Sequence, residues 1–309
     1  MEKITSTTVQ DSFNESTVAL HYARAAHQLG LWASERLLIE RWLPDRAAPL
    51  LDVGCGAGRV AFGLWDLGYR NLTAVDFAGE LLDHARRLAS LRAVTSIRFL
   101  QADATQLTQC NVLRDKGASA GDGVNARCDP EQPETRCNVL RDKPSGEATA
   151  SATDAGGASG GLREEEGFAG ALFMFNGLMQ IPGRDDRRQA LREIRAVCRP
   201  DACFLFTTHD RDDDSRRQPL WAAEAGRWAR GEEDPRLIEF GDRYFANEHG
   251  GHTFMHLPTR TEVLEDLAAT GWTPLFDEMR RAIAPESAAV REFADECRFW
   301  VACAGHENA

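Results

Sequence analysis

The sequence has no apolar run near the roughly 20 residues that a membrane-spanning helix needs, so we expect no membrane segment. Its N-terminus, MEKITSTTVQDSFNES, lacks the basic stretch followed by an apolar stretch of a secretory signal. Basic residues are scarce as well: 36 Lys and Arg stand against 48 Asp and Glu, a formal charge of −12. This excess argues against a general nucleic-acid backbone binder. We expect a cytoplasmic protein without a membrane or nucleic-acid partner, as a monomer or homodimer.

The eight cysteines include no C-x-x-C pair, and no Cys/His group has zinc-finger spacing. We therefore expect reduced thiols. The histidines His249, His252 and His256, in HGGHTFMH, could suggest a metal site. Two imidazoles four residues apart on one strand are too distant to share a zinc ion unless a third ligand folds back. We predict no metal site.

Short apolar runs alternate with amphipathic helical segments along most of the chain, which indicates repeated β-α-β units. Parallel strands joined by right-handed crossovers form an open sheet with helices on both faces. We predict an α/β fold with a doubly wound, mostly parallel seven-stranded sheet, an antiparallel last strand pair, an N-terminal helical lid and a cap insertion. The expected strands cover residues 49–53, 72–75, 96–100, 168–176, 203–208, 272–279 and 298–304, and the main helices cover 33–42, 60–67, 80–91, 185–198 and 261–270.

Composition divides the chain further. We predict a helical lid over residues 1–44, a ligand-binding core over 45–108 and 167–305, and an insertion over 109–166. The heptapeptide CNVLRDK occurs twice in the insertion, at 110–116 and 137–143, and the rest is rich in Gly, Ala, Ser and Asp. Such a stretch buries too little apolar surface to offset its ordering entropy, so we expect disorder. Residues 210–258 form a cap, which we expect to be irregular apart from a hairpin.

The most specific motif is LDVGCGAGR at residues 51–59, where three alternate glycines leave a strand and enter a helix. Glycine permits positive φ and lets a ligand approach the backbone. Asp76 follows the second strand, where a carboxylate can accept hydrogen bonds from ribose hydroxyls, and Asp103 follows the third. Ligands of such sheets bind beyond the carboxyl ends of the strands, so these groups are expected to share one site.

These motifs resemble the class I S-adenosylmethionine-dependent methyltransferase family. The matching segments are LDVGCGAGR, AVD at 74–76, QADA at 101–104, FMFNGLMQIP at 173–182 and RPDACFLFTT at 199–208. Asp201-Ala202 replaces the Gly-Gly pair of the family's turn before the last of these strands. The resemblance covers about residues 45–108 and 167–305, and it implies S-adenosylmethionine as cofactor.

The resemblance also implies roles for single residues. Asp76 would hold the ribose, Asp103 and Ala104 would meet the adenine edge, and Asn176 would lie near the methionine moiety or the acceptor. The methionine pocket would be shaped by Asp52, Gly54, Gly56 and Gly58, and Cys55 and Phe77 complete the expected cofactor site.

Methyl transfer requires an aligned nucleophile and, for some acceptors, a base. His209 follows a strand end, and His256 lies in the cap hairpin, so both are candidate catalytic residues. Tyr22, His252 and Tyr244 are candidate substrate contacts. The aromatic residues and polar rim of the cap suit a small organic acceptor, methylated on oxygen or nitrogen.

Three alternatives remain. An NAD-dependent dehydrogenase would carry G-x-G-x-x-G, but Arg59 stands where its third glycine belongs. An RNA or protein methyltransferase is disfavoured by the acidic balance and by FNGL in place of an Asn-Pro-Pro-Tyr type block. A catalytically silent cofactor-binding scaffold is disfavoured by the intact glycine loop and its acids.

Overall fold

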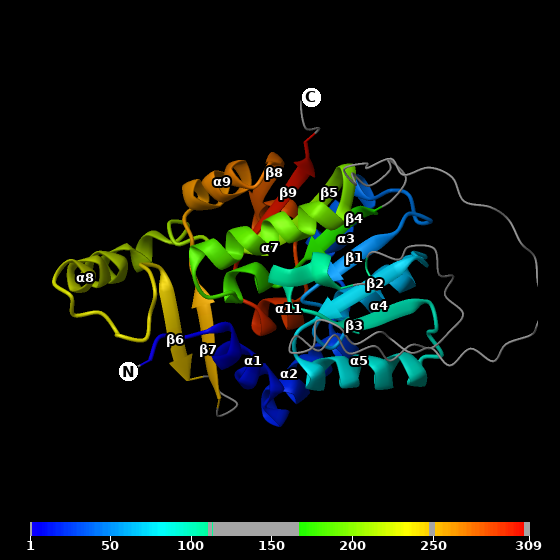
Figure 1. Cartoon of the computed structure of the whole chain (residues 1–309), viewed down its shortest axis with the longest axis horizontal. Coiled ribbons are helices and arrows are strands. Elements are labelled where there is room, and N and C mark those ends of the chain that lie inside the picture. Colours follow the sequence, from blue (N-terminus) through cyan, green and yellow to red (C-terminus); the bar gives the residue numbers. More distant parts are fainter. Residues whose placement is uncertain (1, 111–112, 114–166, 247–250, 306–309) are drawn as a thin grey trace, which may run out of the picture.

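The computed structural model describes residues 2–110, 113, 167–246 and 251–305. Within them a seven-stranded sheet has the order β3-β2-β1-β4-β5-β9-β8 (Figure 1). The first five strands are parallel, and β9 pairs antiparallel with both β5 and β8, as predicted. The strands are β1 Leu50–Val53, β2 Leu72–Asp76, β3 Ile97–Gln101, β4 Phe168–Phe173, β5 Cys198–Thr208, β8 Trp272–Met279 and β9 Arg298–Ala304.

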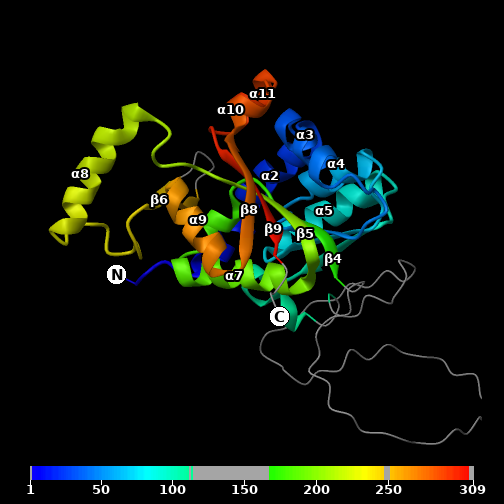
Figure 2. The ribbon, with the colours of Figure 1, turned by 90° about the horizontal axis from the view of Figure 1, so that it is seen from above.

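Helices cover both faces of the sheet because each carries one apolar stripe. On one face lie α3 (Ala33–Trp42), α4 (Arg59–Asp66) and α5 (Gly79–Leu91), and on the other lie α7 (Arg184–Val197) and α9 (Arg260–Ala269) (Figure 2). Every residue of β1 and β2 is buried, as expected for strands between two helical layers. The predicted doubly wound sheet is confirmed.

The N-terminal segment contains one helix more than the sequence pattern indicates. Besides α2 (Ser16–Gln28) and α3, the chain forms α1 (Ser6–Asn14), whose first turn is closed by a capping box between Thr5 and Thr8. Helix α1 was missed because its apolar residues are few and only Val9 is buried. Among the described residues, no helix is long and apolar enough to cross a membrane.

The cap is more regular than expected. Residues 218–229 form α8 (Gln218–Ala229), which lies away from the sheet and buries only Trp221 (Figure 1). The expected hairpin is present as β6 (Asp242–Ala246) and β7 (His252–His256). Short helical segments complete the described chain: η1 Ala104–Gln109, η2 Gly177–Gln180, η3 Ser215–Arg217, α10 Arg280–Ile283 and α11 Ala288–Phe293.

The first CNVLRDK copy begins inside the core. Cys110 and Leu113 are 3% and 1% exposed and belong to the apolar cluster that also contains Leu107 and Ile194. The expectation that the whole insertion contributes nothing to the core is therefore wrong at its start. Residues 111–112 and 114–166, including the second copy, lie outside the described residues.

Candidate active site

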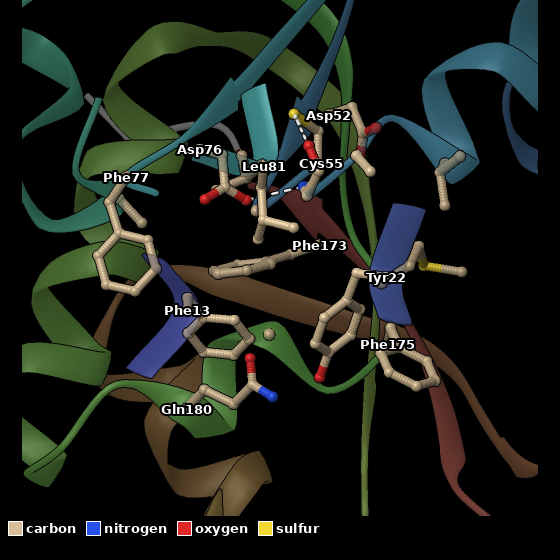
Figure 3. Close-up of a pocket in the computed structure, with 18 of the residues that line it drawn as sticks. Phe13, Tyr22, Asp52, Cys55, Asp76, Phe77, Leu81, Phe173, Phe175 and Gln180 are labelled. Carbon is tan, nitrogen blue, oxygen red and sulfur yellow. Dashed lines mark hydrogen bonds between the residues drawn. The ribbon is translucent and has the colours of Figure 1, made fainter. Parts of the chain in front are cut away.

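A pocket opens beyond the carboxyl ends of β1 to β4, where the sequence places its site (Figure 3). Its floor comes from the glycine loop and its roof from α1 and α2. In Figure 3 the ring of Phe173 lies between Asp52 and Asp76 on one side and Phe13 and Tyr22 on the other. The predicted cofactor residues that line the pocket are Asp52, Gly54, Cys55, Gly56, Asp76, Phe77, Asp103 and Ala104.

The glycine loop needs its glycines for two different reasons. Gly54, Gly56 and Gly58 have φ of +60°, +54° and +88°, which L side chains rarely adopt. A Cβ on Gly54 would overlap the Phe173 ring, so close packing also requires glycine there. A Cβ on Gly56 would meet no atom within 4 Å. The backbone at Gly56 is thus open to a ligand, whereas Gly58 packs against Phe62 behind the pocket.

Asp76 ties the glycine loop to the end of β2. Its Oδ2 accepts a hydrogen bond from the Gly56 amide at 2.7 Å, and its Oδ1 accepts one from the Ala78 amide at 2.8 Å. Burial raises the pKa of this carboxyl to about 6, although the amide donors act in the opposite direction. A ligand that donates hydrogen bonds would favour the charged carboxylate.

Asp52, at the end of β1, has an unsatisfied acceptor. Its side chain is 3% exposed, and its Oδ2 has no hydrogen-bond partner among the described residues. Burial raises the pKa of this carboxyl to about 8, and the nearby Arg59 guanidinium only partly offsets that effect. A buried acceptor of this kind carries a desolvation cost, which a cationic ligand group would relieve.

Asp103 caps the 3-10 helix η1 and lines the pocket beyond the end of β3. Its Oδ1 accepts hydrogen bonds from the Thr105 amide and from the Thr105 hydroxyl, both at 2.8 Å. The neighbouring Ala102 and Ala104 line the same wall. The three acids thus lie in one pocket, each at the end of a different strand.

A buried ion pair that sequence reasoning missed supports the loop from behind. Arg59 donates to both carboxylate oxygens of Glu35 at 2.6 Å, and Glu35 also accepts the Trp32 amide at 2.8 Å. The Arg59 guanidinium lies 4.8 Å from the Trp32 ring centroid. Arg59 therefore links α3 to the start of α4, and no local pattern shows that Glu35 is its partner.

Aromatic side chains form most of the remaining wall. Tyr22 lies 5.6 Å from Phe13 and 6.0 Å from Phe175, measured between ring centroids. The Tyr22 hydroxyl is hydrogen-bonded to Gln180, and burial raises its pKa to about 12, so it stays protonated at neutral pH. Of these residues, only Tyr22 was predicted from the sequence as a site residue.

A second, more open pocket adjoins the first. The two share Tyr22, Ala25 and Phe293. The second pocket extends between α2, the β6–β7 hairpin and α11, with apolar residues such as Val18 and Phe245 in its wall and the charged residues Arg24, Glu292 and Asp295 at its rim.

His209 lies beside this region but does not line either pocket. Its Nδ1 is 3.1 Å from the Glu296 carbonyl oxygen, which can only accept, so Nδ1 carries the proton. Its Nε2 then accepts from the Asn176 amide nitrogen at 3.2 Å. Burial lowers the pKa of His209, which favours this neutral form.

Asn176 also lies behind the wall rather than in it. It and Phe175 are consecutive non-glycine residues with positive φ, 59° and 57°, a strained turn of the kind that concentrates at functional sites. The Asn176 backbone amide donates to the Thr207 hydroxyl at 2.8 Å, while its Oδ1 is buried without a partner among the described residues.

The structure does not bring the cap histidines into the site. His256 is fully buried and hydrogen-bonds Asp242 at 2.8 Å and Glu262 at 2.7 Å, which fastens the hairpin to α9. His252 is exposed and stacks on Tyr244, with 5.0 Å between centroids, outside both pockets. Alternation places His252 and His256 on one strand face, but only His256 reaches the core.

One group in the described residues has metal-ligating side chains close together: Glu239, His256 and Glu262. Arg187 donates to Glu239 at 2.9 Å and lies 3.4 Å from Glu262. The guanidinium already supplies the positive charge that a metal ion would bring. The network is therefore better described as ion pairs.

Residues 50–124 match a family model described as a methyltransferase domain. No curated protein sequence matches the chain. A S-adenosylmethionine-dependent methyltransferase structure from Methanosarcina mazei is 14% identical, with a TM-score of 0.55, over 90% of this chain and 100% of that one.

Two further structures share the fold. The [4+2]-cyclase SpnF is 15% identical, with a TM-score of 0.55, over 99% of this chain and 98% of its own. The other is the 1,6-didemethyltoxoflavin-N1-methyltransferase of Burkholderia thailandensis, with bound 1,6-didemethyltoxoflavin and S-adenosylhomocysteine. It is 18% identical, with a TM-score of 0.51, over 97% of this chain and 88% of its own.

Proposed function

We propose that this chain, a class I S-adenosylmethionine-dependent methyltransferase, methylates an oxygen or nitrogen atom of a small-molecule acceptor. One observation carries the proposal. The pocket that holds the glycine loop and three acids adjoins a second pocket, which is lined by both apolar and polar side chains, among them the charged Arg24, Glu292 and Asp295. That pairing provides separate spaces for a cofactor and an organic acceptor.

The residues in the first pocket suit S-adenosylmethionine. In this proposal Asp76 accepts the ribose hydroxyls, and Asp103 with Ala104 meets the adenine edge. The unpartnered Asp52 Oδ2 is a suitable acceptor for the methionine ammonium group, whose positive charge would offset the cost of burying the carboxylate. The open backbone at Gly56 leaves space for the cofactor chain.

Bound S-adenosylmethionine supplies an already activated methyl group, so the protein chiefly aligns the acceptor and excludes water. The aromatic residues Phe13, Tyr22 and Phe175 provide a dry wall. Tyr22 lines both pockets, and Gln180 holds its hydroxyl, which suits it to orient an acceptor at their junction.

We infer that His209 positions Asn176 rather than taking a proton from the acceptor. Both of its ring nitrogens are engaged, one by the Glu296 carbonyl and one by the Asn176 amide. Holding that amide stabilises the strained turn that presents Phe175 to the pocket. In this account His209 takes no proton from the acceptor.

A methyl-transfer assay tests the proposal. The protein is incubated with methyl-labelled S-adenosylmethionine and either the low-mass or the macromolecular fraction of a cell extract. We expect label in low-mass products, and less of it with Asp76→Asn at the same low cofactor concentration. Label in RNA or protein would favour the macromolecular alternatives, and binding without transfer would favour a silent scaffold. Because a cyclase shares this fold, transfer must be measured rather than assumed.

A further inference from the structure

Two cysteines face each other across the antiparallel part of the sheet. Cys203 in β5 pairs directly with Cys303 in β9. Residues directly opposite on neighbouring strands project from the same face of the sheet. Leu205 and Val301, two residues along each strand, project from the same face as the two cysteines. Both belong to the apolar cluster on the α3–α4 face, and Cys203 packs against that cluster.

The spacing of opposite residues suits a disulfide after a small adjustment. Antiparallel partners have Cα atoms about 4.5–5.5 Å apart, within the roughly 4.4–6.8 Å range of disulfides. Their Cβ atoms are about 4.5–5.5 Å apart, slightly more than the roughly 3.5–4.5 Å of a disulfide. A bond between Cys203 and Cys303 would therefore form with some strain, and strained disulfides are readily reduced.

Solvent access separates this pair from the other described cysteines. Cys55, Cys110, Cys198 and Cys297 are buried, whereas Cys203 and Cys303 are both half-buried. An oxidant in solution can therefore reach the two thiols that already face each other. On the opposite edge of β5, Cys203 pairs with Gly170 of β4, and this glycine adds no side chain beside the thiol.

We propose that Cys203 and Cys303 are a redox-modification site, which forms a reversible cross-strand disulfide when the protein meets a peroxide. One thiolate attacks a peroxide oxygen, giving a sulfenic acid and releasing hydroxide. The second thiol displaces the sulfenic oxygen as water and forms the S–S bond. In total two thiols and one hydrogen peroxide give one disulfide and two waters.

Thiolate availability sets the rate of this reaction. Burial and, less strongly, the Asp201 carboxylate raise the pKa of both thiols, and Cys303 raises that of Cys203 further. The oxidation is therefore slow at neutral pH and faster in alkali. The bond would join β5 to β9 in the middle of β5, where its pairing with β9 begins, whereas His209 follows the end of β5 and the cofactor pocket is lined by residues of other strands and helices. It would resist unfolding of the C-terminal strands without closing the pocket.

The experiment uses the full chain with Cys128→Ser and Cys137→Ser, which removes the two cysteines outside the described residues. The protein is treated with hydrogen peroxide, digested without reduction and analysed by mass spectrometry. We expect a peptide pair joined through Cys203 and Cys303, 2 Da lighter than its reduced parts and released by dithiothreitol. We also expect a melting temperature a few degrees higher than that of the reduced form.

Single variants provide the controls. Cys203→Ser and Cys303→Ser should each stop the reaction at a sulfenic acid on the cysteine that remains, which dimedone traps, and Cys297→Ser should leave the disulfide unaffected. The affinity for S-adenosylhomocysteine should be the same before and after oxidation. Thiols that remain free after prolonged treatment at pH 9, or a disulfide between other cysteines, would overturn the proposal.

Discussion

At the scale of single residues, buried carboxylates dominate the pocket. Asp52 and Asp76 are 3% and 5% exposed, and burial raises the pKa of each. Both therefore carry an electrostatic cost in the ligand-free protein that a hydrogen-bonding or cationic ligand can relieve. Ligand affinity and ligand-free stability should respond in opposite directions when either carboxylate is neutralised.

Asp76→Asn should weaken S-adenosylmethionine binding by on the order of 1–3 kcal/mol, because one charged acceptor is lost while the side-chain shape is kept. Titration calorimetry measures the change. Asp83→Asn, on the exposed face of α5, is the matched control and should bind as the unaltered protein does. Equal affinity for Asp76→Asn and the control would place the ribose elsewhere.

Asp52→Asn should stabilise the ligand-free protein in a pH-dependent way. The folded pKa of about 8 exceeds the ordinary 3.8, so protonation of Asp52 favours the folded state. That contribution is complete below about pH 4 and is lost as pH rises through about 8. The variant's advantage in melting temperature should therefore grow from pH 4 to pH 9. A constant difference in melting temperature across that range would show that the ionised Asp52 carboxylate does not destabilise the folded protein.

The sequence identifies part of this site, because glycines and acids at strand ends are a local signal. Asp52, Asp76 and Asp103 could be found from motif position alone. Glu35 and Gln180 could not, because each reaches the site through a contact distant in the sequence, with Arg59 and Tyr22 respectively. His209 was predicted at the correct strand end, but its partners show that it faces the protein interior.

At the scale of elements, a buried imidazole fastens the β6–β7 hairpin to α9. Burial disfavours the charged form of His256, but its hydrogen bonds to Asp242 and Glu262 outweigh that effect and raise its pKa. The charged Arg187 of α7 faces Glu262 and Glu239, and it opposes the increase in the pKa of His256. Because the hairpin contributes Phe245 and Thr253 to the second pocket, this attachment also shapes that pocket.

His256→Gln should destabilise the protein most at low pH. With a folded pKa above the usual 6.5, the imidazolium contribution is complete below pH 6.5 and is lost as pH rises through the raised value. At pH 6 the loss should be about 1–3 kcal/mol, the scale of a buried charged hydrogen bond. Chemical denaturation at pH 6 and pH 9 measures it, with the exposed His252→Gln as control. A loss that is as large at pH 9 as at pH 6 would contradict the imidazolium assignment.

The duplicated heptapeptide allows a matched deletion series. Removing residues 114–166 should leave thermal stability nearly unchanged, whereas removing 110–166 should cost about 2–5 kcal/mol, because Cys110 and Leu113 leave the core. Removing 110–136 brings the second CNVLRDK directly after Gln109, so it should restore stability. Equal melting temperatures for all three deletions would show that Cys110 and Leu113 contribute nothing to stability.

Element prediction succeeded where the apolar period is strong and failed where it is weak. The predicted 33–42 and 298–304 match α3 and β9, which bury consecutive apolar residues such as Leu38 and Ile39 in α3 and Phe299 to Ala302 in β9. Helix α8 was missed because it buries only Trp221 and therefore has no apolar stripe. The short α10 and α11 also fall below the length at which periodicity can be recognised.

At the scale of the whole molecule, the strand order explains why one pocket collects these residues. The strands β3, β2, β1 and β4 are adjacent and parallel, so Asp103, Asp76, Asp52 and Phe173 end at the same edge. The alternating pattern predicted this sheet, and the predicted N-terminal lid is present as α1 and α2 over that edge. No local pattern shows which contacts hold the lid in place. These contacts, such as the Gln10 side-chain amide donating to the Phe77 carbonyl at 2.7 Å, join segments 67 residues apart.

The most direct test of the central claim is calorimetric titration of the full chain with S-adenosylmethionine and S-adenosylhomocysteine, with NADH as the control. The account predicts micromolar binding of both sulfur ligands, no binding of NADH, and weaker binding by Asp76→Asn. Binding of NADH, or no binding of either sulfur ligand by the folded protein, would contradict it.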